Sequence, residues 1–273
     1  MTSGYTPEER LIPYRASTFA ARRVLVLAPH ADDEVFGCGA ALADLAARGA
    51  SIEVFVLTDG AGDEPDPAVR RRIAASRLEE SRAALAELGG GDVRAGEFRD
   101  RRLEDDPAAL RAALTREIAA FRPDLVFAPS PVEIHPDHRA LAAALVALAS
   151  SAVPALSDAA VAFYEVSQPI RPNFLFDCGR HAEAKARAAK AFISQNGSRD
   201  YPGFVAGLNS FRRMTLPEET SAVEGFWVAQ AASLRGVSLA GLGAKMGPSA
   251  DLPERRLSWG ERWRVFLTGS FPR

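Results

Sequence analysis

The sequence predicts an α/β fold in which an open, doubly wound, mostly parallel sheet lies between two layers of helices. Short apolar runs alternate with longer helical segments from residue 23 to residue 166. This alternation is typical of parallel strands joined by crossover helices. The runs are apolar almost throughout, as expected for strands that helices cover on both faces. Together, the two observations indicate a three-layer αβα arrangement.

The first three strands are expected at residues 23–27, 52–57 and 93–98. The first is a continuous apolar run, the second is apolar except for Glu53, and the third is weaker. A helix at residues 34–48 is rich in Ala and Leu and is stopped by Gly49. A second helix, at residues 67–88, ends at a run of glycines.

Three further helices are expected at residues 107–121, 138–150 and 182–194. Two further strands are expected at residues 125–128 and 161–166. Asp106 is a suitable N-cap for the first of these helices, and Pro107 suits its first turn. Residues 167–273 are less regular, and residues 231–273 are expected to form an irregular C-terminal extension. This extension is expected either to cover the site or to mediate assembly. It contains the aromatic residues Trp259, Trp263, Phe266 and Phe271.

The composition is that of an ordinary globular protein. The chain has 273 residues, of which 47% are hydrophobic and 25% are charged, and its formal net charge is −2. This length can form one domain over residues 1–273, with a core at about residues 20–230. The near-neutral charge and the absence of a basic patch argue against a nucleic-acid partner.

The sequence gives no sign of a membrane or secreted protein. No stretch approaches the roughly 20 apolar residues of a membrane-spanning helix. The first fifteen residues are polar and interrupted by prolines, so no signal peptide is expected. Cys38 and Cys178 form neither a CxxC pair nor a metal-type pattern. A reducing, cytoplasmic location is therefore expected.

Two polar motifs follow two of the predicted strands. They are Pro29-His30-Ala31-Asp32-Asp33-Glu34 and His135-Pro136-Asp137-His138. In the wound order 3-2-1-4-5, the strands that precede these motifs lie side by side, where the winding direction reverses. Ligands of open α/β sheets bind at that place, so we expect one site built from both motifs.

The spacing within both motifs suits a metal. His30 and Asp33 are three residues apart, as are His135 and His138, so each pair can face one point near the start of a helix. A catalytic zinc takes three protein ligands and leaves a fourth position open. The two motifs offer four candidate ligands for three ligand positions, so one of the four residues is free for another role.

Additional polar residues beside the ligands favour a hydrolase. Asp32 and Asp137 lie next to the candidate ligands, and a hydrolase needs a base together with an acid or electrophile. Taken alone, Asp32 and Asp33 could cap a helix, and the second motif could be a loop with an N-cap. Their expected convergence at adjacent strand ends favours the metal site.

The two motifs together resemble the PIG-L/LmbE-like family of zinc-dependent N-acetylglucosamine deacetylases. The resemblance covers roughly residues 20–230. Weaker points of similarity are Arg77-Leu78-Glu79-Glu80, Asp100, Tyr164-Glu165, residues 185–195 and Glu224-Gly225-Phe226.

The resemblance implies roles for the residues of both motifs. The metal ligands would be His30, Asp33 and His138. Asp32 would be the general base that takes a proton from the water that zinc activates. His135 would face the oxyanion that develops on the substrate carbonyl, or would protonate the departing amine.

Further roles follow from the same resemblance. Asp137 would support His135 or His138 through a hydrogen bond. Arg77 and Asp100 would contact sugar hydroxyls.

The chain also departs from the family pattern. Ala31 stands where the family commonly has proline, a position that shapes the loop without supplying chemistry. Glu133 and Ile134 stand where many members have glycine and an aromatic residue. We expect this second departure to change the wall of the substrate pocket but to leave catalysis intact.

The function that these observations predict is metal-dependent hydrolysis of an N-acyl group, expected to be N-acetyl, on the amino sugar of a glycoconjugate. The cofactor would be Zn²⁺, although His and carboxylate ligands also suit iron(II), cobalt(II) and nickel(II). The alternative is an amidase or esterase that acts on a non-sugar substrate. A homo-oligomer is compatible with the sequence.

Two other classes are disfavoured. A non-catalytic binding module would need neither Asp32 nor His135. A nucleotide-binding Rossmann domain would carry GxGxxG at its first turn, where this Rossmann-like chain has only Gly37-Cys38-Gly39.

Overall fold

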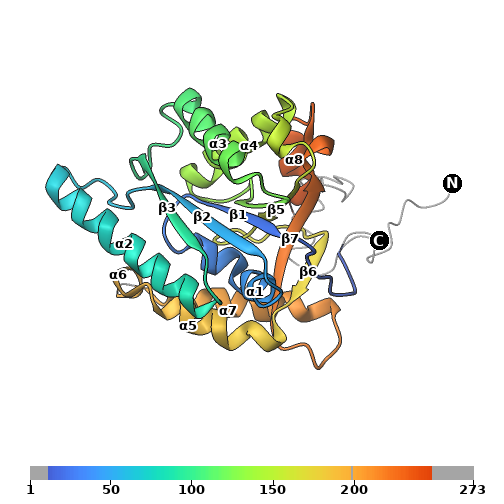
Figure 1. Cartoon of the computed structure of the whole chain (residues 1–273). Coiled ribbons are helices and arrows are strands. Elements are labelled where there is room, and N and C mark those ends of the chain that lie inside the picture. Colours follow the sequence, from blue (N-terminus) through green and yellow to red (C-terminus); the bar gives the residue numbers. More distant parts are fainter. Residues whose placement is uncertain (1–11, 198, 248–273) are drawn as a thin grey trace, which may run out of the picture.

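A seven-stranded sheet forms the centre of the computed structural model, which describes residues 12–197 and 199–247 (Figure 1). The strands are β1 (Arg23–Ala28), β2 (Ser51–Thr58), β3 (Asp92–Phe98), β4 (Leu125–Pro129), β5 (Ala160–Tyr164), β6 (Phe174–Asp177) and β7 (Val223–Gln230). Their order across the sheet is β3-β2-β1-β4-β5-β7-β6. The first five strands are parallel, whereas β7 runs antiparallel to both β5 and β6.

Helices cover both faces of the sheet. They are α1 (Asp33–Ala47), α2 (Pro67–Glu87), α3 (Pro107–Phe121), α4 (Pro136–Ser150), α5 (Ala182–Lys190), α6 (Ile193–Asn196), α7 (Tyr201–Phe211) and α8 (Leu239–Met246). Figure 1 shows α3, α4 and α8 over one face, with α1, α2, α5 and α7 over the other. No helix in the described part of the chain has the length and apolar character needed to cross a bilayer.

The predicted fold class and the predicted order of the first five strands are confirmed. Strands β6 and β7 were not expected, because β6 has only four residues and the β7 sequence carries a glycine and a buried glutamate. The single helix expected at residues 182–194 is wrong, since it is divided into α5 and α6. The backbone leaves the helical conformation at Phe192, whose side chain is fully buried and packs against Phe36 at 5.9 Å between ring centroids.

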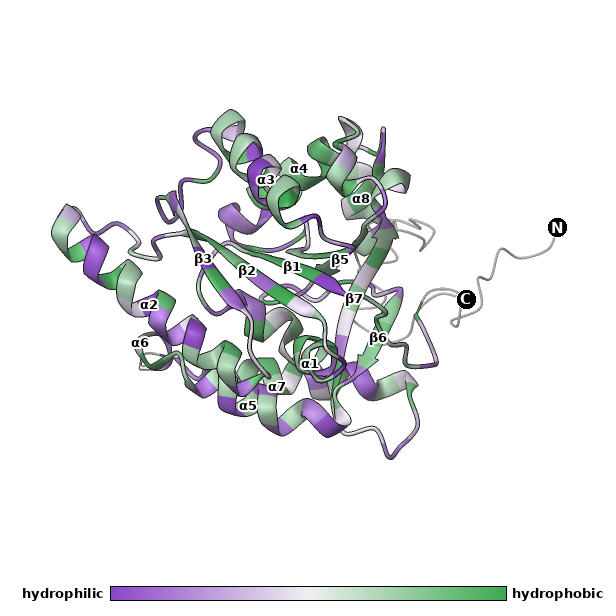
Figure 2. Ribbon diagram, viewed as in Figure 1, coloured by the Kyte–Doolittle hydropathy of each residue, from purple (hydrophilic) through white to green (hydrophobic). Residues whose placement is uncertain are grey.

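Two hydrophobic cores lie on opposite faces of the sheet, because successive side chains of a strand point in opposite directions. On β1, Val24 and Val26 belong to the core on the α1 side, whereas Leu25 and Leu27 belong to the core on the α3 and α4 side. Figure 2 shows the apolar strands enclosed by helices whose outer faces are more polar.

The described part of the C-terminal extension packs against the second core. A short 3-10 turn at Ala231–Leu234 and helix α8 place Leu234, Leu242 and Met246 in contact with that core, and all three are buried. The aromatic residues of the predicted extension, from Trp259 to Phe271, lie outside the described residues.

Helix α1 is kinked at Cys38, whose φ of −144° and ψ of 19° are not helical. A buried ion pair fills the break. The Glu224 carboxylate of β7 accepts hydrogen bonds from the amides of Ala40 and Ala41, at 2.8 and 2.9 Å. Lys185 of α5 donates to the carbonyl of Phe36 at 2.9 Å and to Glu224 at 2.7 Å. The pair thus satisfies backbone groups that the kink frees on both of its sides.

The first turn of α1 is also held by close packing at Gly37. A Cβ added there would lie 2.6 Å from Cγ of Tyr164. The Tyr164 ring is fully buried, and its hydroxyl donates to the carbonyl of Leu27 at 3.0 Å, so the ring has little freedom to move.

We expect Gly37→Ala to destabilise the protein by about 1–3 kcal/mol, as overpacking of a filled core does. Chemical denaturation would measure the loss. Gly207→Ala in α7 is the matched control, because an added Cβ there meets no atom within 4 Å. Removing a helical glycine should leave that variant as stable as the wild type or up to about 1 kcal/mol more stable. Equal stability of both variants would contradict the tight fit at Tyr164.

Candidate functional site

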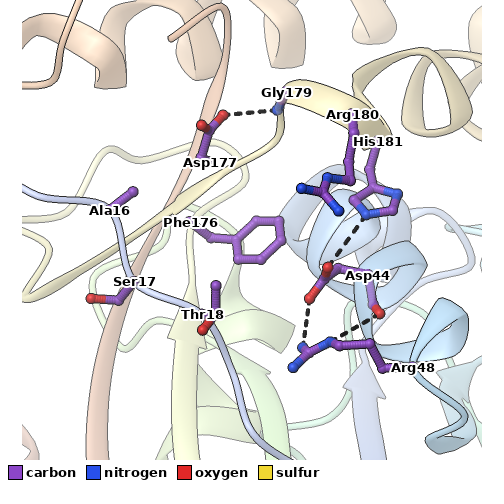
Figure 3. Close-up of a pocket in the computed structure, with 10 residues that line it drawn as sticks. All are labelled: Ala16, Ser17, Thr18, Asp44, Arg48, Phe176, Asp177, Gly179, Arg180 and His181. Carbon is purple, nitrogen blue, oxygen red and sulfur yellow. Dashed lines mark hydrogen bonds and ion pairs between the residues drawn. The ribbon is translucent and has the colours of Figure 1, made fainter.

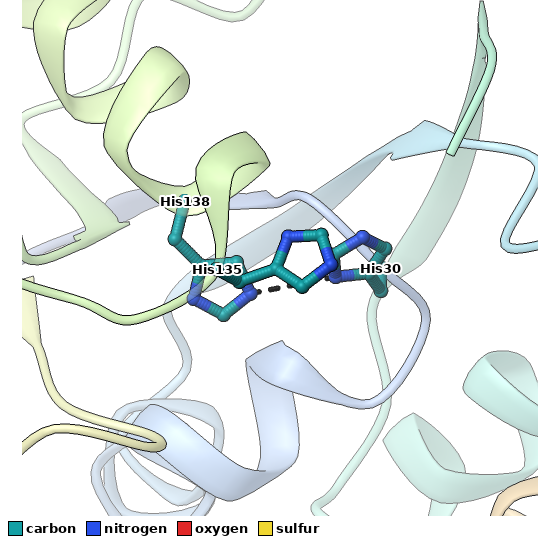
Figure 4. A group of neighbouring side chains, drawn as sticks. All are labelled: His30, His135 and His138. Atoms are coloured by element: carbon teal, nitrogen blue, oxygen red, sulfur yellow. Dashed lines mark hydrogen bonds between the residues drawn. The ribbon is translucent and has the colours of Figure 1, made fainter. Parts of the chain in front are cut away.

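The two sequence motifs converge at the carboxyl ends of β1 and β4, which are neighbours in the sheet. His30 follows β1, while His135 caps α4 and His138 lies in the first turn of that helix. The ring centroid of His30 lies 4.5 Å from that of His135 and 5.4 Å from that of His138 (Figure 4). The two motifs therefore lie together, as the sequence predicted.

Three donor atoms form a compact triangle. Nδ1 of His30 lies 3.3 Å from Oδ2 of Asp33 and 3.4 Å from Nε2 of His138. Nε2 of His138 lies 3.1 Å from the same Asp33 oxygen. A tetrahedral site with bonds of about 2.0–2.1 Å has ligand atoms about 3.3–3.4 Å apart. The side chains of this triangle thus fit the donor set and the spacing of a zinc-type metal.

The electrostatics of the triangle favour a cation. Burial opposes ionisation of Asp33, yet the imidazoles of His138 and His30 hold the pKa of its carboxyl well below its ordinary value. Burial also opposes protonation of His138, but Asp33 and Glu133 raise its pKa to about 9. The groups around these imidazoles therefore attract positive charge, which a divalent metal would supply.

Two carboxylates hold the other side of His30. Its Nε2 lies 3.1 Å from Oδ1 of Asp100 and 3.3 Å from Oδ2 of Asp137. Asp137 is fixed in turn by the backbone amides of Arg101 and Leu103, at 2.7 and 3.1 Å. Such contacts to the second nitrogen of a metal-binding histidine set the orientation of its ring.

This arrangement adds to two expectations. Asp137 was expected to support His135 or His138, and its carboxylate contacts His30 instead, while its amide donates to His135. Asp100 lines the cavity, with one oxygen against His30 and the other accepting from the amide of Gly62 at 3.0 Å, and its expected contact with sugar hydroxyls stays a prediction. The backbone path of residues 100–103 brings both contacts about, and no sequence motif encodes that path.

Asp32 lies beside the triangle in an unusual backbone conformation. Its φ of 140° is rarely adopted by a residue with a side chain, and such conformations are retained mainly at functional sites. Its amide donates to Oε2 of Glu34 at 2.9 Å, and the buried Glu34 also accepts from the Ser81 hydroxyl. Burial, followed by the Asp33 carboxylate, raises the pKa of Asp32 well above its ordinary value. Its carboxylate is therefore suited to hold a proton.

His135 faces the same cavity with a defined tautomer. Its Nδ1 accepts a hydrogen bond from the amide of Asp137 at 3.2 Å, which assigns the ring proton to Nε2. Burial, followed by His30 and His138, lowers the pKa of His135. A neutral imidazole that donates from Nε2 fits both observations.

Glu133 is a residue whose place the sequence analysis did not predict. Neither it nor Ile134 lines the cavity directly, and the expected change in the pocket wall stays a prediction. Ile134 is 65% exposed, whereas Glu133 is buried behind His138, with Oε2 3.6 Å from Nδ1 of that histidine. Glu34 was also missed as a support of Asp32. Glu133 contacts Val166 and Ser167, and Glu34 contacts Ser81, and local patterns gave no signal of these remote partners.

The cavity at the site has a volume of about 350 Å³. Arg77 lines it, as expected for a substrate contact. Phe36 and Tyr201 add an aromatic wall, with their rings stacked at 6.1 Å between centroids. The other lining residues are His30, Asp32, Asp33, Asp100, Arg101, His135, His138, Val166, Ser167 and Gln195. A polar floor beside an aromatic wall suits a ligand that carries both hydroxyl groups and apolar faces.

A second cavity, of about 410 Å³, lies between the segment at Ala16–Thr18, the end of α1 and the turn at Gly179–His181 (Figure 3). Its charged groups largely pair with one another. Arg48 pairs with Asp44 at 2.5 Å, and Asp44 also lies 3.4 Å from His181. Among the described residues, no group of side chains that could hold a metal ion lies at this cavity.

Comparisons with known proteins find related sequences and structures. Residues 25–149, which contain both motifs, match the PIG-L family, described as GlcNAc-PI de-N-acetylase. Diacetylchitobiose deacetylase of Thermococcus kodakarensis is 29% identical, over 64% of this chain and 70% of the relative. 1D-myo-inositol 2-acetamido-2-deoxy-alpha-D-glucopyranoside deacetylase of Rhodococcus opacus is 33% identical, over 43% of this chain and 49% of the relative.

A solved structure supports the same relationship. N,N'-diacetylchitobiose deacetylase of Pyrococcus horikoshii superposes with a TM-score of 0.66 at 26% sequence identity, over 77% of this chain and 85% of the other. The similarity extends beyond the matched family segment and includes the layered sheet. The sequence and structure comparisons therefore support a relationship of this chain to the PIG-L/LmbE-like N-acetylglucosamine deacetylases.

Proposed function

We propose that this protein is a metal-dependent N-deacetylase that hydrolyses the N-acyl group, expected to be N-acetyl, of an amino sugar within a glycoconjugate. The observation that carries the proposal is the triangle of donor atoms from His30, Asp33 and His138, with edges of 3.1–3.4 Å, beside Asp32 and His135. The related deacetylases named above act on amino-sugar compounds, which supports the substrate class.

The three residues of the triangle would hold the metal, and zinc is the expected ion. A divalent metal at this place would activate a water molecule and polarise the amide carbonyl of the substrate. Asp100 and Asp137 would keep His30 in the orientation that binding requires. Both motifs thus contribute to one centre.

The remaining chemistry falls to Asp32 and His135. Asp32 would take the proton from the attacking water and later deliver a proton to the departing amine. His135 would donate from Nε2 to the carbonyl oxygen as negative charge develops there. The acceptor role of its Nδ1 favours this assignment over proton delivery by His135.

Substrate binding would use the cavity walls. Arg77 is the candidate contact for sugar hydroxyls, while the stacked pair of Phe36 and Tyr201 offers a flat apolar surface for a sugar face. The polar lining favours an amino sugar over the alternative, a non-sugar amide or ester. The expected cytoplasmic location, possible oligomerisation and single-domain organisation stay predictions.

The test is to measure bound metal and acetate release from N-acetylglucosamine conjugates. We expect about one metal per chain, loss of activity on treatment with a chelator, and recovery when zinc is added back. Bound metal with hydrolysis of a non-sugar amide or ester, but no release from any amino sugar, would favour the alternative. A folded protein without metal would contradict the proposal.

A further inference from the structure

Glu133 contacts two parts of the site at once. It precedes α4, and its side chain is fully buried. A buried carboxylate needs several hydrogen-bond donors to offset the loss of its hydration. The partners that Glu133 uses come from the metal-binding motif and from a separate wall of the cavity.

The first group of partners is the loop that follows β5. The Glu133 carboxylate accepts hydrogen bonds from the amides of Val166 and Ser167, at 2.6 and 3.1 Å, and from the Ser167 hydroxyl. Val166 and Ser167 both line the cavity. One buried carboxylate therefore holds this stretch of the pocket wall in place.

The second partner is His138. Its Nδ1 lies 3.6 Å from Oε2 of Glu133, which is longer than a hydrogen bond. This Nδ1 is buried and has no hydrogen-bond partner among the described residues. A small rotation of either side chain would close the gap. The other ring nitrogen, Nε2, faces Asp33 and His30.

We propose that Glu133 is a positioning residue that couples the metal centre to the pocket wall. It orients His138 by accepting the proton of Nδ1, and it holds Val166 and Ser167 through their backbone amides. The inference rests on the proposed function to the extent that His138 binds the metal through Nε2. When the metal is bound, Nδ1 keeps its proton, and the contact with Glu133 becomes a charge-assisted hydrogen bond.

The coupling has a physical consequence. A carboxylate behind a ligating histidine fixes the ring and makes it a better donor to the metal, and removal of such a group weakens metal affinity by about 10–100-fold. Because the same carboxylate holds the wall, metal binding should also stabilise the amides of Val166 and Ser167 against exchange with solvent. A role in folding alone predicts no dependence of that exchange on metal.

The experiment compares the wild type with Glu133→Gln and with a matched control, Glu117→Gln. Glu117 is a buried glutamate of α3 that pairs with Arg94, away from the cavity. Zinc dissociation constants would be measured by competition with a chromophoric chelator. Hydrogen exchange would be followed for the segment 165–168 with and without zinc.

We expect Glu133→Gln to bind zinc about 10–100-fold more weakly, and Glu117→Gln to bind it as the wild type does. In the wild type, zinc should slow exchange at Val166 and Ser167, and Glu133→Gln should lose this dependence. An unchanged dissociation constant in a folded Glu133→Gln would overturn the proposal. So would zinc-independent exchange in the wild type, a measurement that stands even if the variant fails to fold.

These outcomes separate the inference from the proposed function. Absence of zinc binding in the wild type would overturn both. Tight binding and acetate release that persist unchanged in Glu133→Gln would overturn the role of Glu133 and leave the proposed function intact.

Discussion

Replacing Asp32 by Asn is expected to lower acetate release by about 10²–10⁴-fold, the range over which general acid–base groups contribute. The amide of Asn has the size of the carboxylate but cannot accept a proton from water. Asn also has the shape of Asp, so the backbone at φ 140° should persist as it does in the wild type. The change thus removes the proton acceptor with little other disturbance.

Metal binding separates this role from ligation. The Asp32 carboxylate is not part of the donor triangle, which comprises His30, Asp33 and His138. Asp32→Asn should therefore keep its metal while losing activity, whereas His138→Ala should lose both. Metal analysis and acetate release on the same samples would make the distinction.

Asp105→Asn is the matched control for Asp32→Asn. Asp105 is exposed, pairs with Arg102 at 3.6 Å and lies outside the cavity, so its loss should not affect turnover. Full activity of metal-loaded Asp32→Asn would show that the general base is another residue and would remove a central part of the proposed mechanism.

The sequence predicted best what local patterns determine. The continuous apolar runs of β1, β2 and β4 identified parallel strands, because a strand covered on both faces has little use for polar residues. The two motifs identified the site, since their positions after β1 and β4 follow from the winding rule of the sheet. Neither inference required contacts between remote side chains.

The features that the sequence did not predict are set by distant partners. Strand β7 joins the sheet through pairing with β5, and β6 pairs with β7 at the edge, where a short strand carries little pattern of its own. Asp100 and Asp137 contact His30 because Arg101 adopts a φ of 64°, which turns the backbone at residues 100–103. A motif names the residue types at a site, but contacts of this kind depend on the folded path of the chain.

The sequence also did not predict the buried ion pair of Lys185 and Glu224, because its two members are remote in sequence. Loss of this pair should have the largest effect on the stability of the protein. Lys185 and Glu224 come from α5 and β7 and are almost fully buried. Removing one member of a buried pair leaves the other charge without compensation, which costs about 3–5 kcal/mol. Lys185→Met is therefore expected to lower the free energy of unfolding by that amount, as measured in urea.

Because the pair lies at the kink of α1, zinc binding provides a second measurement of its loss. Lys185 holds the carbonyl of Phe36, in the same short turn that carries Asp33. Loosening that turn should weaken zinc binding even at temperatures where Lys185→Met remains folded. Glu224→Gln should also weaken zinc binding. The Gln side chain has one oxygen in place of two, so one of the backbone N–H groups of Ala40 and Ala41 would lose its acceptor.

Arg187→Met in the same helix provides the comparison. Arg187 pairs with Glu87 at 2.7 Å, but its side chain is 57% exposed, so solvent screening leaves the pair little net value. The double variant Lys185→Met/Glu224→Gln should lose less stability than the two single losses combined, because neither charge is then left unpaired in the core. Additive losses would mean that the two residues stabilise the kink independently. A Lys185→Met protein as stable as Arg187→Met would mean that the kink of α1 is held by the packing of Gly37 against Tyr164 alone.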